Sequence, residues 1–406
     1  MSETGVKLTL GAGHPGFAVR LSLFYGAVFL LIGLHLPFFP VWLKWRGLTP
    51  EEIGIILSAP LAVRVFFTPA ISFAADRIGD RRFVIVLLAW GTVSGLLLYT
   101  LAQGFWAVLG ISILTAMAWT SIMPVTEAVA MDGVRREGHD YGRMRLWGSL
   151  TFIAASFGGG LALQFWGPPS ALWMMIVAAI GILVAAYLLP RPEGKGRLKA
   201  ATMLPQIRLK NALALVRSPL FLLFLLATGL VQSTHAVYYA FGTIHWQAQN
   251  ISAAVIGLLW AVGVIAEILL FMFSKRVLKV CSPVNLICVA AIASVMRWSI
   301  TAFSPPLGLL FVVQALHGLT FGAAHLGAVH FITEAAPAEA TGTAQGVYAS
   351  CSIGIMMGAA LGASGPLYAA FGGYAYLTMA AIGVAAFLPA LLLARRWQHE
   401  KTISID

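Results

Sequence analysis

The residues of this chain that could do chemistry are few, and they lie in apolar surroundings. Four charged side chains are enclosed by apolar sequence: Arg64, Glu127, Glu267 and Arg297. A fifth, Arg145, begins another apolar stretch. A guanidinium can hold a carboxylate by two parallel hydrogen bonds, and a carboxyl group can take up and release a proton. These residue types therefore favour anion binding and proton transfer.

Histidine is the other chemical feature. The run VQALHGLTFGAAHLGAVH, residues 313–330, contains His317, His325 and His330 and no other titratable group. On an α-helix, His325 would lie about 80° around the axis from His317 and about 12 Å along it, so both could border one cavity. We expect a functional role for His317. His325 is either a proton relay or a structural hydrogen-bonding group, and His330 faces solvent or headgroups. The run has no His-x-x-x-His pair and no nearby carboxylate, which argues against a metal site.

The elements that must position these residues are membrane-spanning helices. The chain is 59% hydrophobic and only 10% charged, which is too apolar for a water-soluble protein. A helical span needs about 20 mostly apolar residues. Such stretches occur near 18–43, 50–75, 83–103, 105–130, 145–165, 171–189, 219–246, 252–273, 283–303, 306–332, 343–370 and 374–394. The sequence thus predicts an all-α membrane protein with twelve transmembrane helices in two six-helix halves.

The basic residues are distributed unevenly about these spans. The net charge of +11 would suggest a nucleic-acid partner in a soluble protein, but 22 of the 26 lysine and arginine residues fall on one side of the predicted membrane. Lys44 and Arg46 fall on the other side. The positive-inside rule then predicts a cytoplasmic (inner) membrane protein with both termini in the cytoplasm and no nucleic-acid partner. The sequence has no G-x-x-x-x-G-K-[ST] loop, which argues against direct coupling to ATP.

The chain divides once, at the basic segment 191–218, which separates residues 1–190 from 219–406. Part of this segment, 204–216, is either an amphipathic surface helix or a solvated linker. A short pattern repeats: IGIILSAPLAVR begins in the second span and IGLLWAVGVIAE in the eighth. Each places a charge ten residues after a glycine, Gly54 to Arg64 and Gly257 to Glu267. This layout favours the parallel repeats of a secondary transporter.

Helical spacing predicts which faces turn inward. Placing an ionisable group at mid-membrane costs on the order of 3 kcal/mol, so such groups are functional or are ion pairs kept for packing. Residues three, four and seven apart share a face. The resulting polar and aromatic stripes are Thr228, Gln232, His235, Tyr239 and Trp246; Trp260 with Glu267; Trp119 and Met123 with Glu127; and Gln345, Tyr348 and Ser352. They are either ordinary helix contacts or the walls of a polar cavity.

Several segments resemble known transporters. DRIGDRR, between the second and third spans, resembles the signature loop of the major facilitator superfamily. LPFFPVWL and TEAVAMDGVRREGHDYGRMRLWGS resemble the lactose permease branch. STHAVYYAFGTIHWQA followed by AVIGLLWAVGVIAEILLF resembles the 3-phenylpropionic acid transporter family. The resemblance extends over all twelve spans.

The resemblance also implies roles for individual residues. By similarity to lactose permease, Glu127 and Arg145 would contact substrate, whereas Glu267, Arg297 and His317 would serve proton coupling and substrate contact. The sequence departs from that pattern at Thr320, where a proton-carrying carboxylate is expected, and at Gln314, where a lysine is expected. The acidic pair of the seventh span is also missing.

We therefore expect a proton-coupled symporter for a small aromatic carboxylate. Arg64 and Arg297 balance Glu127 and Glu267 before Arg145 is counted, so an anionic substrate would leave a net buried charge that one proton cancels. Glu267 is the first candidate for that proton, followed by Glu127, His317 and His325. The candidates for binding substrate are Arg297, Arg145, Arg64, Trp119, His235, Tyr239, Trp260, Gln345 and Tyr348.

Two other functions remain open. A proton-coupled sugar or nucleoside symporter would use the same scaffold. A membrane-embedded enzyme or receptor would need a nucleophile, metal or cofactor constellation, and the sequence shows none. We expect a monomer in the lipid bilayer, with a small-molecule substrate and protons as its partners and no cofactor.

Overall fold

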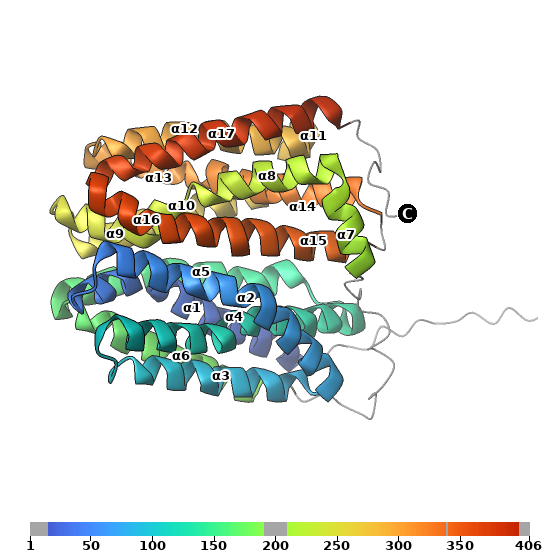
Figure 1. Cartoon of the computed structure of the whole chain (residues 1–406). Helices are drawn as coiled ribbons and strands as arrows, with labels where there is room; N and C mark the ends of the chain where they lie inside the picture. The colour runs from blue at the N-terminus through green and yellow to red at the C-terminus, as the bar shows by residue number, and fades with distance from the viewer. Residues whose placement is uncertain (1–14, 191–208, 338–339, 398–406) are drawn as a thin grey trace, which may run out of the picture.

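The computed structural model describes residues 15–190, 209–337 and 340–397, and these residues form two bundles of helices (Figure 1). The first bundle contains α1 (Pro15–Trp45), α2 (Pro50–Ile78), α3 (Arg81–Leu98), α4 (Gly104–Glu137), α5 (Tyr141–Trp166) and α6 (Pro169–Leu188). The second contains the α-helices α7 (Leu209–Arg217), α8 (Pro219–Ser233), α9 (Ala236–Ala248), α10 (Ala253–Met272), α11 (Ser274–Val280), α12 (Pro283–Ala302), α13 (Leu307–Ala315), α14 (Ala324–Ala335), α15 (Thr341–Tyr348), α16 (Met357–Phe371) and α17 (Ala375–Arg396). It also contains the π-helices η1 (Gly318–Ala323) and η2 (Ala349–Met356) and the 3₁₀ turn η3 (Gly372–Tyr374).

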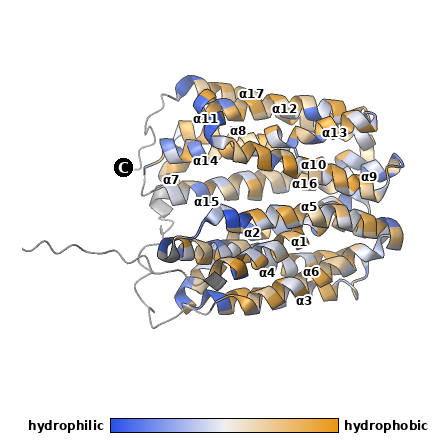
Figure 2. Cartoon of the chain, turned by 180° about the vertical axis from the view of Figure 1, so that it is seen from behind, coloured by the Kyte–Doolittle hydropathy of each residue, from blue (hydrophilic) through white to orange (hydrophobic). Residues whose placement is uncertain are grey.

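The predicted membrane crossings are all present in the described residues. Eleven stretches are long and apolar enough to cross a membrane, and the last, Thr341–Arg396, has 56 residues. It turns at Gly372, whose φ of +53° suits glycine, and therefore makes two crossings. This confirms the all-α architecture with twelve crossings. Figure 2 shows apolar residues along the lengths of the helices and polar residues gathered at their ends.

The linker region adds one short helix. We call the end of the molecule at Leu188 and Leu209 the linker end, and the opposite end the far end. Of the two alternatives for 204–216, a helix is found: α7 lies beside α8 and α15 and buries Leu215 completely. Residues 204–208 lie outside the described part of the chain.

The two bundles meet through two equivalent pairs of helices, α5 with α10 and α2 with α16. A Cβ atom on Gly257 would lie 2.1 Å from the Ser156 carbonyl oxygen, and one on Gly54 would lie 3.0 Å from that of Leu361. The glycines of the repeated sequence pattern thus occupy equivalent crossing points. Two further glycines make close backbone approaches of the same kind. A Cβ atom on Gly160 would lie 2.3 Å from the carbonyl oxygen of Ala253, the first residue of α10, and one on Gly365 would lie 2.5 Å from that of Pro50, the first residue of α2. All four contacts lie in the far-end half of the molecule, so the bundles touch backbone to backbone there.

Several spans of the second bundle are not continuous α-helices. The seventh breaks at Thr234 and His235, between α8 and α9, and the tenth and eleventh contain η1 and η2. The predicted stripe from Thr228 to Trp246 assumed an unbroken helix, and the break means that its members do not share one face. Thr228 contacts Ser352, at 3.5 Å between hydroxyl oxygens, whereas Trp246 packs on Tyr238. Such irregularities often mark functional positions.

A charged cluster joins α2, α3 and α4 at the linker end. The Arg81 guanidinium donates to Asp76 Oδ1 at 2.8 Å and also to the Asp132 carboxylate, which in turn accepts from Arg135. Asp76 and Arg81 belong to the DRIGDRR segment. This cluster ties three helices of the first bundle together where they leave the membrane.

Candidate functional site

The most deeply buried charge in the described residues is Arg297 on α12, whose exposed fraction is 0%. Its Nη1 donates to Thr320 Oγ1 at 3.0 Å and to His317 Nδ1 at 3.1 Å, and its Nη2 donates to Gln314 Oε1 at 2.8 Å. All three partners lie on the span formed by α13 and η1. The two departures from the lactose permease pattern, Thr320 and Gln314, are therefore direct partners of this arginine.

The partners of His317 and His235 determine which ring nitrogen of each neutral histidine carries the hydrogen. Arginine has no acceptor, so His317 Nδ1 must accept, and a neutral His317 carries its hydrogen on Nε2. His235 Nδ1 is 3.1 Å from the Gln232 carbonyl oxygen, which can only accept, and its Nε2 is 3.1 Å from Thr320 Oγ1. A neutral His235 therefore accepts the Thr320 hydroxyl hydrogen. At the break between α8 and α9, the Gln232 carbonyl oxygen also accepts from the His235 backbone N–H at 3.1 Å, so backbone and ring of His235 bond to the same oxygen.

Aromatic rings surround the Arg297 guanidinium. Its Cζ lies 4.4 Å from the ring centroid of Trp298 and 5.0 Å from that of Tyr238. Tyr238 stacks on Trp260 at 4.3 Å, and Trp260 Nε1 donates to Thr243 Oγ1 at 3.0 Å. An arginine can stack on such rings while an N–H group without another partner among the described residues, here Nε, remains able to bind an anion.

No carboxylate within the described residues forms an ion pair with Arg297. Its Nε also has no hydrogen-bond partner there. A buried charge of this kind is costly unless it is paired. The site therefore holds a planar cation that lacks a matching anion.

Glu267 lies beside this cluster on α10. Its Oε2 is 3.8 Å from His317 Nε2, the nitrogen that carries the hydrogen, and its side chain is 22% exposed. Gly263 and Gly318 allow α10 and η1 to approach closely enough for this contact. Arg145, from the first bundle, is near enough to interact electrostatically with both Glu267 and His325. Glu267 thus contacts the Arg297 cluster through His317 and is also under the electrostatic influence of Arg145.

The first bundle contributes a second polar group. Glu127 on α4 accepts a hydrogen bond of 2.7 Å from the Tyr141 hydroxyl on α5. Arg145 lies over Phe29 of α1, with its Cζ 3.9 Å from the ring centroid, and Tyr25 packs edge-on against Tyr141. Glu127 and Arg145 form no ion pair with one another among the described residues, so both remain able to contact a ligand.

Trp119 lies in a separate aromatic group within the first bundle. His35 of α1 packs edge-on against Trp119 with centroids 4.6 Å apart, and stacks on Phe39 at 4.7 Å. His35 is an ionisable residue in the middle of the first span, so the rule that selected the intramembrane charges could also have found it.

The structure separates some predicted residues from the Arg297 cluster. The Arg64 side chain has no hydrogen bond or ion pair to the cluster in the described part of the chain, and Gln345 is exposed on α15. Tyr348 packs on Phe224, 5.5 Å between centroids, in a core near the linker end. His235 is fully buried in the cluster, and Tyr239 stacks on His235 at 5.6 Å.

The placement of His325 differs from the α-helical expectation. Phe321 stacks on His317 at 5.3 Å and on His325 at 6.1 Å, so the three rings form a column. The predicted offset of about 80° assumed a regular α-helix. The π-helix η1 has more residues per turn than an α-helix, which changes the offset between residues eight apart.

The comparisons with known proteins agree with this architecture. Residues 18–382 match the model of the MFS_1 like family. This chain belongs to that family of the major facilitator superfamily. It is an integral membrane transporter for small molecules and not an enzyme, because its relatives and structural neighbours are transporters.

Individual relatives of this MFS_1-like transporter differ in what their names say they carry. The chain is 32% identical to the "Probable 3-phenylpropionic acid transporter" of Escherichia coli (strain K12), over 92% of this chain and 96% of the relative. It is 27% identical to the maltose permease of Geobacillus stearothermophilus, over 82% and 83% of the two chains. The crystal structure of the nucleoside transporter NupG superposes with a TM-score of 0.82 at 16% identity, covering 94% of this chain and 100% of the other.

Proposed function

We propose that this transporter is a proton-coupled symporter of a small aromatic carboxylate that resembles 3-phenylpropionate. The observation that carries the proposal is Arg297, a fully buried guanidinium held by neutral partners and lined by aromatic rings. A substrate carboxylate would supply its missing anion, and the substrate ring would pack on Tyr238 and Trp260. The name of the Escherichia coli relative supports the same substrate class.

The charges near the site favour the coupling of a proton. The two clusters hold Arg145 and Arg297 against Glu127 and Glu267, which is neutral overall when all four are ionised. Entry of an anion would leave one uncompensated negative charge in a low-dielectric site, and one proton would remove it. Glu267 is the proposed carrier, because its contact with His317 Nε2 connects it to Arg297. Binding at Arg297 and protonation at Glu267 would then favour one another.

Transport would follow from rocking of the two bundles about the site. We propose the bodies 1–190 and 219–406 as the moving halves and 191–218 as the connection between them. Backbone contact in the far-end half, together with partial exposure of Glu267, supports a state that opens toward the linker end. With that end in the cytoplasm, as the positive-inside rule predicts, the state faces inward. Both parts of the site come from one chain, so we propose a monomer in the inner membrane.

An uncharged sugar or nucleoside is the second candidate substrate, favoured by the names of the maltose permease and NupG. Counterflow separates the two candidates. Proteoliposomes loaded with unlabelled 3-phenylpropionate should take up the labelled compound, and external aromatic acids should compete. Counterflow of labelled maltose or uridine, with none of labelled 3-phenylpropionate, would replace the carboxylate by a neutral substrate.

A further inference from the structure

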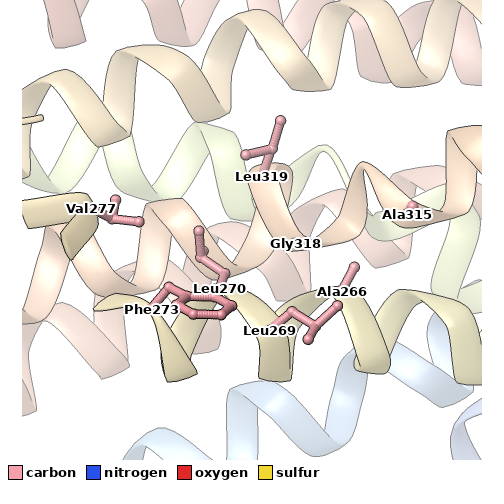
Figure 3. Close-up of a pocket in the computed structure, with 8 residues that line it drawn as sticks. All are labelled: Ala266, Leu269, Leu270, Phe273, Val277, Ala315, Gly318 and Leu319. Atoms are coloured by element: carbon pink, nitrogen blue, oxygen red, sulfur yellow. The ribbon is translucent and has the colours of Figure 1, made fainter. Parts of the chain in front are cut away.

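A groove lies between α10 and the span that contains α13 and η1 (Figure 3). Its volume is about 280 Å³. All of its lining residues are apolar or glycine: Ala266, Leu269, Leu270, Phe273, Val277, Ala315, Gly318 and Leu319. One wall belongs to α10, the other to α13 and η1, and Val277 of α11 lies toward the linker end.

This groove faces outward from the bundle. Leu269, Phe273 and Leu319 are 48%, 43% and 38% exposed, and they lie in segments that cross or border the membrane. Exposed apolar surface on a membrane crossing contacts hydrocarbon. An apolar groove on such a surface can accommodate an acyl chain.

Positive charge lies at the linker end of the groove. Helix α11 carries Lys275, Arg276 and Lys279, all exposed. Arg276 Cζ lies 5.5 Å from the ring centroid of Phe273, a groove residue. The sequence has no aspartate or glutamate between residues 268 and 333. A cation is thus fixed beside the groove, and no acidic residue of this stretch neutralises it.

From this combination we propose that the groove binds one anionic phospholipid. One acyl chain lies between α10 and η1, and the phosphate group is held by Arg276 with support from Lys275 and Lys279. Guanidinium groups bind phosphate oxygens through paired hydrogen bonds, and juxtamembrane basic residues attract anionic lipid. Because Ala266 and Gly318 adjoin Glu267 and His317 in sequence, the lipid packs directly behind the contact between these two residues.

The test uses native mass spectrometry of purified full-length protein exchanged into mixed micelles with equal amounts of phosphatidylglycerol and phosphatidylcholine. Wild type should retain phosphatidylglycerol in preference. The double variant Arg276→Gln/Lys279→Gln should lose on the order of tenfold in that preference. The matched control is Arg395→Gln/Arg396→Gln, which removes two exposed charges from the end of α17. This control should keep the preference for phosphatidylglycerol.

A second pair of variants tests the groove itself. Ala315→Phe fills it and should reduce retention of phosphatidylglycerol while every charge remains. Val312→Phe, on the same helix but not lining the groove, should retain lipid as wild type does. Soluble glycerol phosphate should not displace the lipid, because it has no acyl chain. Equal retention of the two lipids by wild type, equal losses in the two charge variants, or full retention by Ala315→Phe would each overturn the proposal.

Discussion

Arg297 is the residue on which substrate recognition depends in our proposal. Arg297→Lys keeps the charge but not the planar pair of donors, so we expect at least about tenfold weaker binding of 3-phenylpropionate. Binding to purified protein, measured by calorimetry, gives the affinity. Arg395→Lys, an exposed site at the end of α17, is the control and should bind as wild type does. Unchanged affinity in Arg297→Lys would exclude Arg297 as the carboxylate partner.

Glu267 is the residue on which coupling depends in our proposal. Glu267→Gln keeps the size and hydrogen-bonding capacity of the side chain but cannot carry a proton. The variant should lose accumulation driven by an acidic exterior, yet still exchange labelled for unlabelled substrate across vesicles at equal pH. Both activities are measured in the same proteoliposomes.

Glu127→Gln provides the comparison for Glu267, because Glu127 contacts Tyr141 in the first bundle and should support binding. It should weaken accumulation and exchange together. Continued accumulation by Glu267→Gln under an inward proton gradient would move the proton pathway to His317 and His325.

At the scale of the elements, the close packing of α10 against η1 brings Glu267 to His317. A Cβ atom on Gly318 would lie 2.9 Å from the Ala266 carbonyl oxygen, so Gly318→Ala should push the two helices apart. We expect reduced proton-driven accumulation with exchange largely kept. Gly308→Ala on α13, where a Cβ atom meets no other atom within 4 Å, is the matched control. Equal behaviour of the two variants would show that this spacing does not govern coupling.

Regular elements and isolated charges could be predicted from the sequence, and irregular elements could not. The lengths of the apolar stretches predicted the twelve crossings. Arg297 and Glu267 were predicted as site residues because burying a charge in the membrane is costly. Thr320 and Gln314 appeared only as departures from a family pattern, although both bind Arg297. Thr320 and Gln314 reach Arg297 and His235 because the chain breaks after α8 and forms the π-helix η1. Helical periodicity in the sequence predicts neither irregularity.

At the scale of the whole molecule, we expect the far-end contacts between the bundles to hold that end closed. Even a Cβ atom on Gly257 would lie only 2.1 Å from the Ser156 carbonyl oxygen, so the larger side chain of Gly257→Leu should open the far end. Spin labels at Gln103→Cys and Ala248→Cys, both exposed and on different bundles, should report a longer distance than in the parent protein. The background replaces Cys281, Cys288 and Cys351 by serine. Gly181→Leu, at a position where a Cβ atom meets no atom within 4 Å, should leave the distance unchanged. An unchanged distance in Gly257→Leu would contradict this role for the far-end contact.

Coupled movement of substrate and protons is the central claim, and accumulation of labelled 3-phenylpropionate in proteoliposomes tests it most directly. Vesicles containing Arg297→Lys serve as the control, because the neutral acid also crosses a bare bilayer. With an acidic exterior, the initial rate of uptake by wild type should be well above that of the control, and a protonophore should abolish the difference. An initial rate equal to that of the control, or unaffected by collapse of the proton gradient, would contradict proton-coupled transport of an aromatic carboxylate.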